Sequence, residues 1–308
     1  MGRSTFVNAI CQRKDSEDKG VIMRFFRAKT VPMKTWIKDV VRSQNEVVVS
    51  PLGDRLPAFP PDALQIATTG RYGELAIQQA AFFYEDAMQA VVSCGESVKS
   101  DWKLLDFGSG WGRITRLALR DFKLSNIKGI DVDDDLVALS NDLFGAPTFS
   151  ACKPLPPTDV ASDSTHLILA YSVFSHLSED AAKKWLNEFA RMLKPRQFLV
   201  FTSRDISFLD YCRQLAAQRN DVAVSSYQDK LVSTFPADQI DEMKDAYARG
   251  EFIFRGIGGG GVRDGSFYGE AFMPRGWIER EFADKFEVIR ADIDGTRYDQ
   301  FCFALRKK

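Results

Sequence analysis

A ten-residue segment constrains the fold of this 308-residue chain more than any other part of its sequence. Residues 104–113 read Leu-Leu-Asp-Phe-Gly-Ser-Gly-Trp-Gly-Arg, an apolar pair and an acid followed by glycine at every second position. Twenty-one residues after Gly110, a second apolar run ends at Asp131. This pattern predicts strand, glycine turn, helix and strand, the first βαβ unit of a nucleotide-binding sheet. Asp131, at the carboxyl end of the second strand, can accept hydrogen bonds from ribose hydroxyls.

The spacing of the glycines discriminates between nucleotide cofactors. A dinucleotide fingerprint needs G-x-G-x-x-G, whose third glycine packs the helix onto the strand. Counted from Gly108, that third position is Arg113, and the count from Gly110 also fails. The spacing therefore disfavours an NAD-dependent enzyme.

The D-x-G-x-G-x-G pattern from Asp106 to Gly112 resembles the first motif of class I S-adenosylmethionine-dependent methyltransferases. The resemblance implies S-adenosylmethionine as cofactor and a Rossmann-like α/β fold with a seven-stranded, mostly parallel sheet and an antiparallel last strand. Arg71, in a glycine-flanked loop, is then expected to pair with the methionine carboxylate, the alternative being a surface turn residue. For Trp111 the alternative to a pocket wall is helix packing. The cofactor-binding residues implied are Arg71, Asp106, Gly108, Ser109, Gly110, Trp111, Asp131, Val132, Tyr171 and Ser172.

Further segments carry the resemblance to the C-terminus. Residues 171–177 are similar to the family's stretch after the fourth strand, and residues 268–272 to a segment of bacterial glycan and secondary-metabolite methyltransferases. Three positions depart from the family. Residues 151–153 (Ala-Cys-Lys) lack the usual Asp near the adenine, which implies backbone contacts there. Residues 165–166 are Thr-His in place of Phe-Asp, and residues 194–197 replace the Lys-Pro-Gly-Gly turn.

Alternating strand and helix patterns predict a parallel sheet covered on both faces. The expected strands are 103–107, 126–131, 147–150, 166–171, 197–203, 286–293 and 299–306. The expected helices are 76–92, a helix around Trp185 with Ser178 as N-cap, 206–218 and 237–248.

The chain divides into an N-terminal extension with a Pro-rich linker (1–61) and a methyltransferase domain (62–308). Residues 1–50 carry ten Lys or Arg against five acids, which suits either a docking arm for an anionic partner or a solvated extension. Between residues 204 and 276 the alternation stops for too long to be a simple connection, and we expect a helical cap insertion over the substrate. The glycine cluster at 256–261 is either a mobile lid or a flexible connection.

Composition excludes several classes of protein. With 41 basic and 42 acidic residues the net charge is −1, and the core lacks a basic stripe, which disfavours nucleic acid as a partner. No apolar run approaches the roughly 18 residues that a membrane span needs. Five scattered cysteines without a C-x-x-C pair indicate free thiols and a cytoplasmic location. Two histidines argue against a zinc site, so we expect no metal, although a carboxylate-bound Mg²⁺ and the oligomeric state stay open.

The implied cofactor determines which residues methyl transfer would require. A methyl group on sulfonium sulfur is already electrophilic, so the protein mainly aligns the reactants and excludes water. A hydroxyl acceptor must in addition lose its proton to a base. His176, just after the fourth strand, is the first candidate for that base, and its alternative role is packing at a helix N-terminus. Asp205, Tyr268 and Glu270 are further catalytic candidates.

These observations predict a methyltransferase that modifies oxygen or nitrogen of a small-molecule acceptor, with a sugar or glycan precursor as one candidate. Two alternatives remain. One is an enzyme of the same fold that performs other S-adenosylmethionine chemistry. The other is a catalytically silent relative that acts as a scaffold or regulatory partner, because a fold alone does not determine function.

Overall fold

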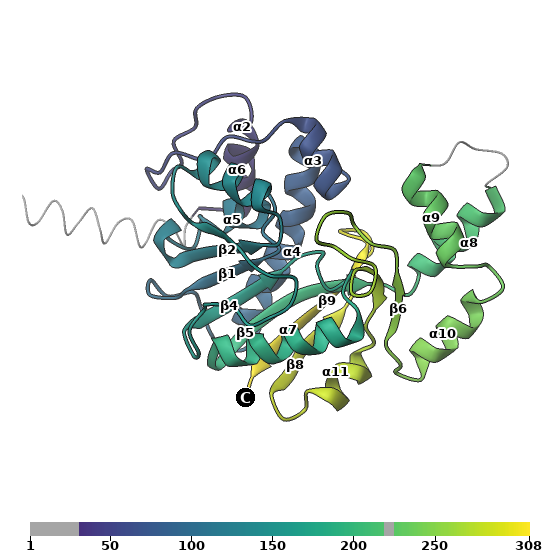
Figure 1. Cartoon of the computed structure of the whole chain (residues 1–308). Helices are drawn as coiled ribbons and strands as arrows, with labels where there is room; N and C mark the ends of the chain where they lie inside the picture. The colour runs from purple at the N-terminus through teal and green to yellow at the C-terminus, as the bar shows by residue number, and fades with distance from the viewer. Residues whose placement is uncertain (1–30, 219–224) are drawn as a thin grey trace, which may run out of the picture.

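The computed structural model describes residues 31–218 and 225–308 and is built on a seven-stranded sheet with helices on both faces (Figure 1). The strands of this sheet are β1 (Leu104–Phe107), β2 (Ile127–Asp131), β3 (Phe149–Ala151), β4 (Thr165–Ala170), β5 (Leu193–Arg204), β8 (Phe286–Asp292) and β9 (Gln300–Lys307). Their order is β3-β2-β1-β4-β5-β9-β8. β1 to β5 are parallel, and β9 runs antiparallel to both of its neighbours. The predicted fold class is confirmed.

The central strands are buried on both faces, and most of their residues are apolar. Every residue of β1 and β4 is buried. Leu104 lies opposite Ile127 on one side and Leu167 on the other. Parallel strands are covered by their own crossover helices, so both faces must be apolar.

Two layers of helices cover this sheet. On one face, α2 (Met33–Arg42), α4 (Gly73–Ser93) and α5 (Arg113–Ala118) share one apolar cluster with the strands. On the other face, α7 (Glu179–Met192) and α11 (Arg275–Glu281) share a second. The remaining helical elements outside the insertion are α3 (Asp62–Thr69), α6 (Asp134–Phe144) and the 3-10 turn η1 (Leu124–Asn126).

Helix α7 begins as its sequence predicts. The Ser178 side chain accepts a hydrogen bond from the Ala181 N–H, which satisfies one of the free donors of the first turn. Trp185, Phe189 and Met192 face the sheet and are fully buried. The helix therefore places the segment after β4 firmly at the carboxyl edge of the sheet.

The described part of the N-terminal segment packs against the domain. Trp36 of α2 is fully buried, and its indole N–H donates to the Arg116 carbonyl over 3.0 Å. The Arg116 guanidinium in turn donates to the Ala58 carbonyl over 2.6 Å. The basic residues before position 31 lie outside the described residues.

An insertion between β5 and α11 forms a lobe at the side of the sheet (Figure 1). It consists of α8 (Phe208–Gln218), α9 (Ser226–Thr234), α10 (Ile240–Ala248) and the hairpin of β6 (Ile253–Gly256) and β7 (Gly269–Phe272). Its helices share a small apolar core that includes Leu209, Phe235 and Met243. Two of its helices match the expected 206–218 and 237–248. None of the described helices is both long and apolar enough to cross a membrane.

The structure differs from the expected elements at several places, because helix α2 and the hairpin β6–β7 were not predicted and two further differences concern α9 and β5. Helix α9 was not predicted, although it carries a capping box formed by Ser225 and Gln228. Strand β5 begins at Leu193 and not at residue 197, because Leu193 pairs with Thr165 before the register shifts. The residues expected to form only a turn are therefore part of the strand, with Arg196 at a φ of 64°.

Candidate active site

The three glycines of the motif, Gly108, Gly110 and Gly112, are not all required for the same structural reason. All have positive φ, which favours glycine. A Cβ on Gly108 would lie 2.4 Å from Val173, and one on Gly112 would lie 2.6 Å from Phe144. A Cβ on Gly110 would meet nothing within 4 Å. Gly108 and Gly112 are therefore needed for packing, whereas Gly110 borders open space where a ligand can approach the backbone.

Asp131 ties the glycine turn to the end of β2. Its Oδ2 accepts the Gly110 N–H over 2.8 Å and its Oδ1 accepts the Asp133 N–H over 3.1 Å. Burial raises the pKa of Asp131, and these two hydrogen bonds oppose the rise. Each carboxylate oxygen retains a lone pair, so Asp131 can still accept hydrogen bonds from a ribose.

Asp106, at the end of β1, is directed toward helix α5. Its Oδ2 accepts from the Thr115 hydroxyl over 2.6 Å and from the Thr115 N–H over 3.1 Å. Burial raises its pKa to about 6. These contacts fix the start of α5 to the strand and hold the glycine turn between them. Its described hydrogen bonds thus position the turn, and a direct cofactor contact stays a prediction.

Trp111 packs against the N-terminal segment. Its ring lies 5.3 Å from the ring of Phe59, and the Arg116 guanidinium lies 4.8 Å from the ring centre. The described contacts of Trp111 thus agree with a role in helix packing, the alternative to a pocket wall. Val132 is half-buried at the end of β2, next to Asp131.

Tyr171 and Ser172 follow β4 directly and border the same edge. The Tyr171 ring stacks on Phe83 at 4.8 Å, and its buried hydroxyl has no partner among the described residues. Burial raises its pKa to about 12, which the charges of Arg113 and Arg71 oppose. Ser172 adopts a φ of 61° and donates its N–H to Thr202. Arg71 is exposed but close enough to act electrostatically on Tyr171.

Three of the four predicted catalytic residues meet at the carboxyl end of β4. The His176 ring stacks on the Tyr268 ring at 5.0 Å, and its Nδ1 lies 2.7 Å from the Gly269 carbonyl oxygen. Glu270 Oε1 lies 3.6 Å from the same Nδ1. The hairpin β6–β7 brings these residues together, because Gly269 N–H donates to the His176 carbonyl over 2.8 Å. Burial lowers the pKa of His176, which favours the neutral imidazole at neutral pH.

Two further residues of this cluster, Arg204 and Tyr227, were not predicted from the sequence, and both contact Glu270. Glu270 is almost fully buried and accepts from Arg204 Nε over 2.5 Å and from the Tyr227 hydroxyl over 2.6 Å. Burial alone would raise the pKa of Glu270, but the His176 ring where it is protonated, the Arg204 charge and these hydrogen bonds hold it below its usual value. Arg204 is the last residue of β5, and its place at the carboxyl edge was the signal available. Tyr227 belongs to α9, the helix that was not predicted.

Asp205 is not part of this cluster. Its Oδ1 accepts from the Ser207 N–H over 2.9 Å, in a turn that leads into α8. The contacts that the structure assigns to it are therefore those of a residue at the start of a helix.

The residues at this edge fit S-adenosylmethionine. Gly110 leaves free space beside Asp131, and three buried polar atoms at or near the turn, Ser109 Oγ, Trp111 Nε1 and the Tyr171 hydroxyl, have no partner among the described residues. Buried polar atoms without partners are rare and indicate a bound group or water. Asp131 would hold the ribose, and the glycine turn with Tyr171 and Ser172 would hold the methionine half.

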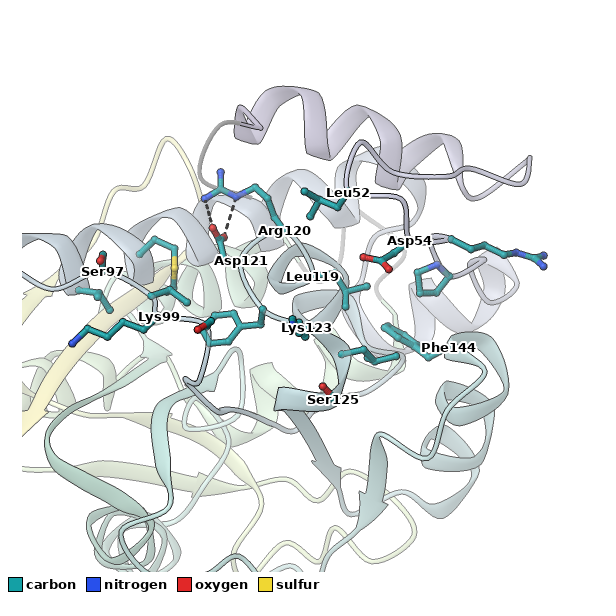
Figure 2. A pocket seen from close by; sticks show the side chains of 18 of the residues that line it. Leu52, Asp54, Ser97, Lys99, Leu119, Arg120, Asp121, Lys123, Ser125 and Phe144 are labelled. Atoms are coloured by element: carbon teal, nitrogen blue, oxygen red, sulfur yellow. Dashed lines mark hydrogen bonds and ion pairs between the residues drawn. The ribbon is translucent and has the colours of Figure 1, made fainter. Parts of the chain in front are cut away.

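A separate cavity of about 730 Å³ lies elsewhere (Figure 2). It is lined by Leu52, by the C-terminal part of α4 including Met88, and by residues 119–125 ahead of β2. Arg71 lies before the opposite end of α4, and none of the predicted site residues lines this cavity. Within residues 31–218 and 225–308, no group of three or more His, Cys, Asp or Glu is arranged to hold a metal ion.

Comparisons with known proteins give a family match. Residues 104–196 match a family model described as a methyltransferase domain. No curated protein matches the chain. Three similar solved structures are an S-adenosylmethionine-dependent methyltransferase from Mesorhizobium loti (13% identity, 71% of this chain and 97% of that chain, TM-score 0.44), a SAM-dependent methyltransferase from Methanosarcina mazei (15%, 68% and 93%, TM-score 0.43), and magnesium protoporphyrin IX methyltransferase from Synechocystis with bound SAH (14%, 76% and 85%, TM-score 0.45).

The matched residues begin at β1 and end within β5, so they contain the glycine turn, Asp131 and His176. The strand order places the reversal of the sheet between β1 and β4, where such folds bind their ligands. The match over residues 104–196 and the order of the strands therefore support a class I S-adenosylmethionine-dependent methyltransferase, with S-adenosylmethionine as its cofactor.

Proposed function

We propose that this methyltransferase acts on oxygen or nitrogen of a small molecule, and that a hydroxyl is the favoured acceptor because His176 is arranged as a base. The observation that carries the proposal is the contact between His176 Nδ1 and the Gly269 carbonyl, at 2.7 Å. A carbonyl oxygen can only accept, so Nδ1 carries the hydrogen. In the neutral ring, Nε2 then has the free lone pair.

Bound S-adenosylmethionine supplies an electrophilic methyl group that needs no activation by the protein. The task of the protein is then to align the acceptor and to take its proton. His176 Nε2 receives that proton, and the imidazolium that forms is stabilised by the Glu270 carboxylate, 3.6 Å from Nδ1. Arg204 and Tyr227 keep Glu270 ionised and in place.

The insertion supports a small acceptor. It supplies Tyr227, Tyr268 and Glu270 beside the edge where the cofactor binds, so an acceptor would lie between the insertion and the sheet. A few placed polar groups can fix the orientation of a small polar molecule. We propose a sugar or glycan precursor as the first acceptor class to test.

The test combines an acceptor panel with a matched pair of histidine variants. Methyl transfer from isotope-labelled S-adenosylmethionine is measured on free and nucleotide-linked sugars and on small amines. His176→Asn keeps a donor for the Gly269 carbonyl but removes Nε2. His166→Asn is the control, because His166 is the second histidine of the chain and its Nδ1 only accepts from the Lys103 N–H, at the amino end of β4.

We expect transfer to a hydroxyl acceptor to fall by about 100-fold or more in His176→Asn, the usual effect of losing a general base. His166→Asn should retain the activity of the unmodified protein. Equal rates for both variants would contradict the role of His176. Cofactor binding without transfer to any acceptor would favour the catalytically silent alternative.

A further inference from the structure

The loop between β6 and β7 (residues 257–268, here called the strap) has a defined structure. Gly259 N–H donates to the Arg263 carbonyl over 2.9 Å, and Arg263 N–H donates to the Gly260 carbonyl over 3.1 Å. At the base of the strap, the N–H groups of Ile257 and Gly258 both donate to the Tyr268 carbonyl. These bonds close a tight turn and present the Arg263 side chain at its tip.

The strap is anchored beside β4 at one end. Leu177 and Tyr268 form an antiparallel bridge, and the Ser178 N–H donates to the Phe267 carbonyl over 2.8 Å. The Tyr268 ring stacks on His176. These contacts hold the C-terminal end of the strap against the segment that follows β4.

The tip of the strap reaches the end of β2. Arg263 Nη2 lies 3.5 Å from Asp133 Oδ2, and both side chains are about one third exposed. Burial raises the pKa of Asp131, and the Arg263 charge is among the influences that oppose this rise. Arg263 Nε is buried and has no partner among the described residues. The guanidinium thus lies beside Asp133, just past the end of β2, and its charge also acts on Asp131.

The order of the strands shows that the strap lies at the carboxyl ends of β2, β1 and β4. β2 and β4 flank β1, and the crevice at their carboxyl ends is where the order of the strands reverses. A loop fixed beside β4 and reaching Asp133 beyond β2 passes across that crevice. The glycine turn after β1 and the Asp131 carboxylate lie in the same crevice.

We propose that Arg263 is a positioning residue that the insertion contributes to the cofactor site: its ion pair with Asp133 fastens the strap across the crevice, and the cofactor exchanges when this contact opens. The proposal rests on the cofactor site described above. An ion pair between partly exposed groups is worth at most about 1 kcal/mol, which corresponds to about fivefold in the opening equilibrium. The contact therefore slows cofactor exchange without preventing it.

The first measurement is the rate of S-adenosylhomocysteine binding and release, followed by surface plasmon resonance. Arg263→Gln removes the charge of the strap. Asp133→Asn removes its partner, yet Asn can still accept from the Leu136 N–H as the N-cap of α6. Arg255→Gln is the matched control, because Arg255 is an exposed arginine on β6 of the same hairpin.

We expect Arg263→Gln and Asp133→Asn each to raise both the association and the dissociation rate constant by about fivefold, and the double variant to show no further change. Arg255→Gln should match the unmodified protein. Unchanged rates in Arg263→Gln would overturn the proposal. An increase in dissociation alone would also overturn it, because that result indicates a direct contact with the ligand and not a strap.

Hydrogen exchange of residues 257–268 without any cofactor provides an independent readout. We expect faster exchange in Arg263→Gln than in Arg255→Gln, because loss of the ion pair favours the open strap. Equal exchange in the two variants would overturn the claim that the ion pair holds the strap closed. If the unmodified protein binds no S-adenosylhomocysteine, the cofactor assignment fails. The exchange measurement still tests whether the Arg263–Asp133 ion pair holds the strap closed, because it needs no cofactor.

Discussion

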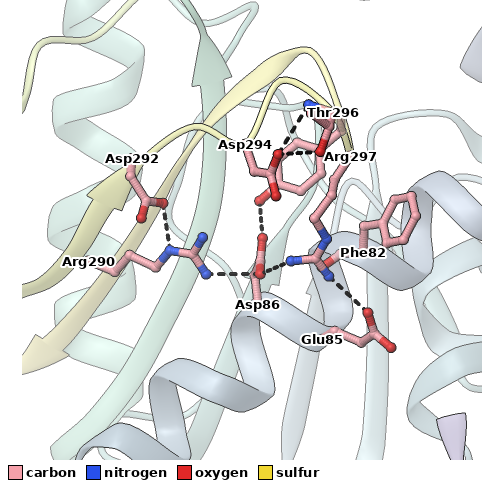
Figure 3. A network of polar contacts seen from close by, with 9 residues as sticks. Phe82, Glu85, Asp86, Arg290, Asp292, Asp294, Thr296 and Arg297 are labelled. Carbon is pink, nitrogen blue, oxygen red and sulfur yellow. Dashed lines mark hydrogen bonds and ion pairs between the residues drawn. The ribbon is translucent and has the colours of Figure 1, made fainter.

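Two carboxylates, Asp86 and Glu270, are buried to almost the same extent, with 1% and 2% of their surface exposed, but their surroundings differ. Asp86 of α4 contacts two guanidinium groups, those of Arg290 and Arg297, and accepts from the Tyr298 hydroxyl (Figure 3). Glu270 contacts one guanidinium group, one tyrosine hydroxyl and a neutral imidazole.

The difference separates a structural charge cluster from one that can respond to a proton. At Asp86, permanent positive charges surround the acid and tie α4 to the turn between β8 and β9. At Glu270, the imidazole of His176 can become charged, and the acid is placed to stabilise that charge. Burial and pairing alone therefore do not distinguish the two acids, and the imidazole beside Glu270 is the feature that Asp86 lacks.

The largest expected effect is on stability at Asp86. Asp86→Ala leaves two arginines without their central acid and should lower the free energy of unfolding by about 3 kcal/mol or more. Urea unfolding measures this loss. The control is Glu85→Ala, because Glu85 pairs with Arg297 from a 40% exposed position, where such pairs are worth about 0.2–1 kcal/mol. Equal losses for both variants would contradict a structural role for Asp86.

The second expected effect compares the two acids through the same kind of change. Glu270→Gln and Asp86→Asn remove a charge while nearly keeping the shape. We expect each to cost about 2 kcal/mol of stability, as for hydrogen bonds that involve charged groups. Only Glu270→Gln should also slow methyl transfer to a hydroxyl, by about 10-fold or more, because the imidazolium loses its support. Equal turnover in the two variants, at a temperature where both are folded, would remove the distinction between the clusters.

The smallest expected effect is the pH dependence of stability that His176 contributes. Burial lowers its pKa below the ordinary 6.5, so the unfolded chain binds this proton first as the pH falls. The stability linked to His176 is therefore present above about pH 6.5 and is lost as the pH falls toward its folded pKa. The loss is at most about 1.4 kcal/mol per pH unit.

Urea unfolding of the unmodified protein and of His176→Asn between pH 7.5 and 5 isolates this contribution. Asp106 has the opposite slope, because its raised pKa of about 6 favours the folded state at lower pH, but it contributes equally to both proteins. A constant difference between the two proteins across this range would contradict the account of His176.

The core of the fold could be predicted because its signals are local. The strand that ends at Asp131 is a short apolar run, and the glycines at 108–112 reflect a turn that few other residues allow. Such features need no knowledge of distant residues. The seven strands of the main sheet accordingly lie close to their predicted positions, apart from the early start of β5 at Leu193.

The insertion could be predicted only in part, because its contacts join residues far apart in the sequence. Arg204 and Glu270 are 66 residues apart, and only the pairing of β7 with the segment after β4 brings Glu270 to His176. The capping box at Ser225 was a readable local signal for α9, and with it Tyr227 could have been placed on a helix. The glycine cluster at 256–261 was expected to be either a mobile lid or a flexible connection, and the contacts of the strap that contains most of it are long-range too.

The most direct test of the account is calorimetric binding of S-adenosylmethionine and S-adenosylhomocysteine to the protein and to Asp131→Asn. The control is Asp135→Asn, an exposed acid in the first turn of α6. The account predicts that both ligands bind and that only Asp131→Asn weakens binding, by about tenfold or more, because hydrogen bonds to a charged acceptor are lost. Absence of binding, or equal binding by Asp131→Asn, would contradict the assignment of the cofactor site.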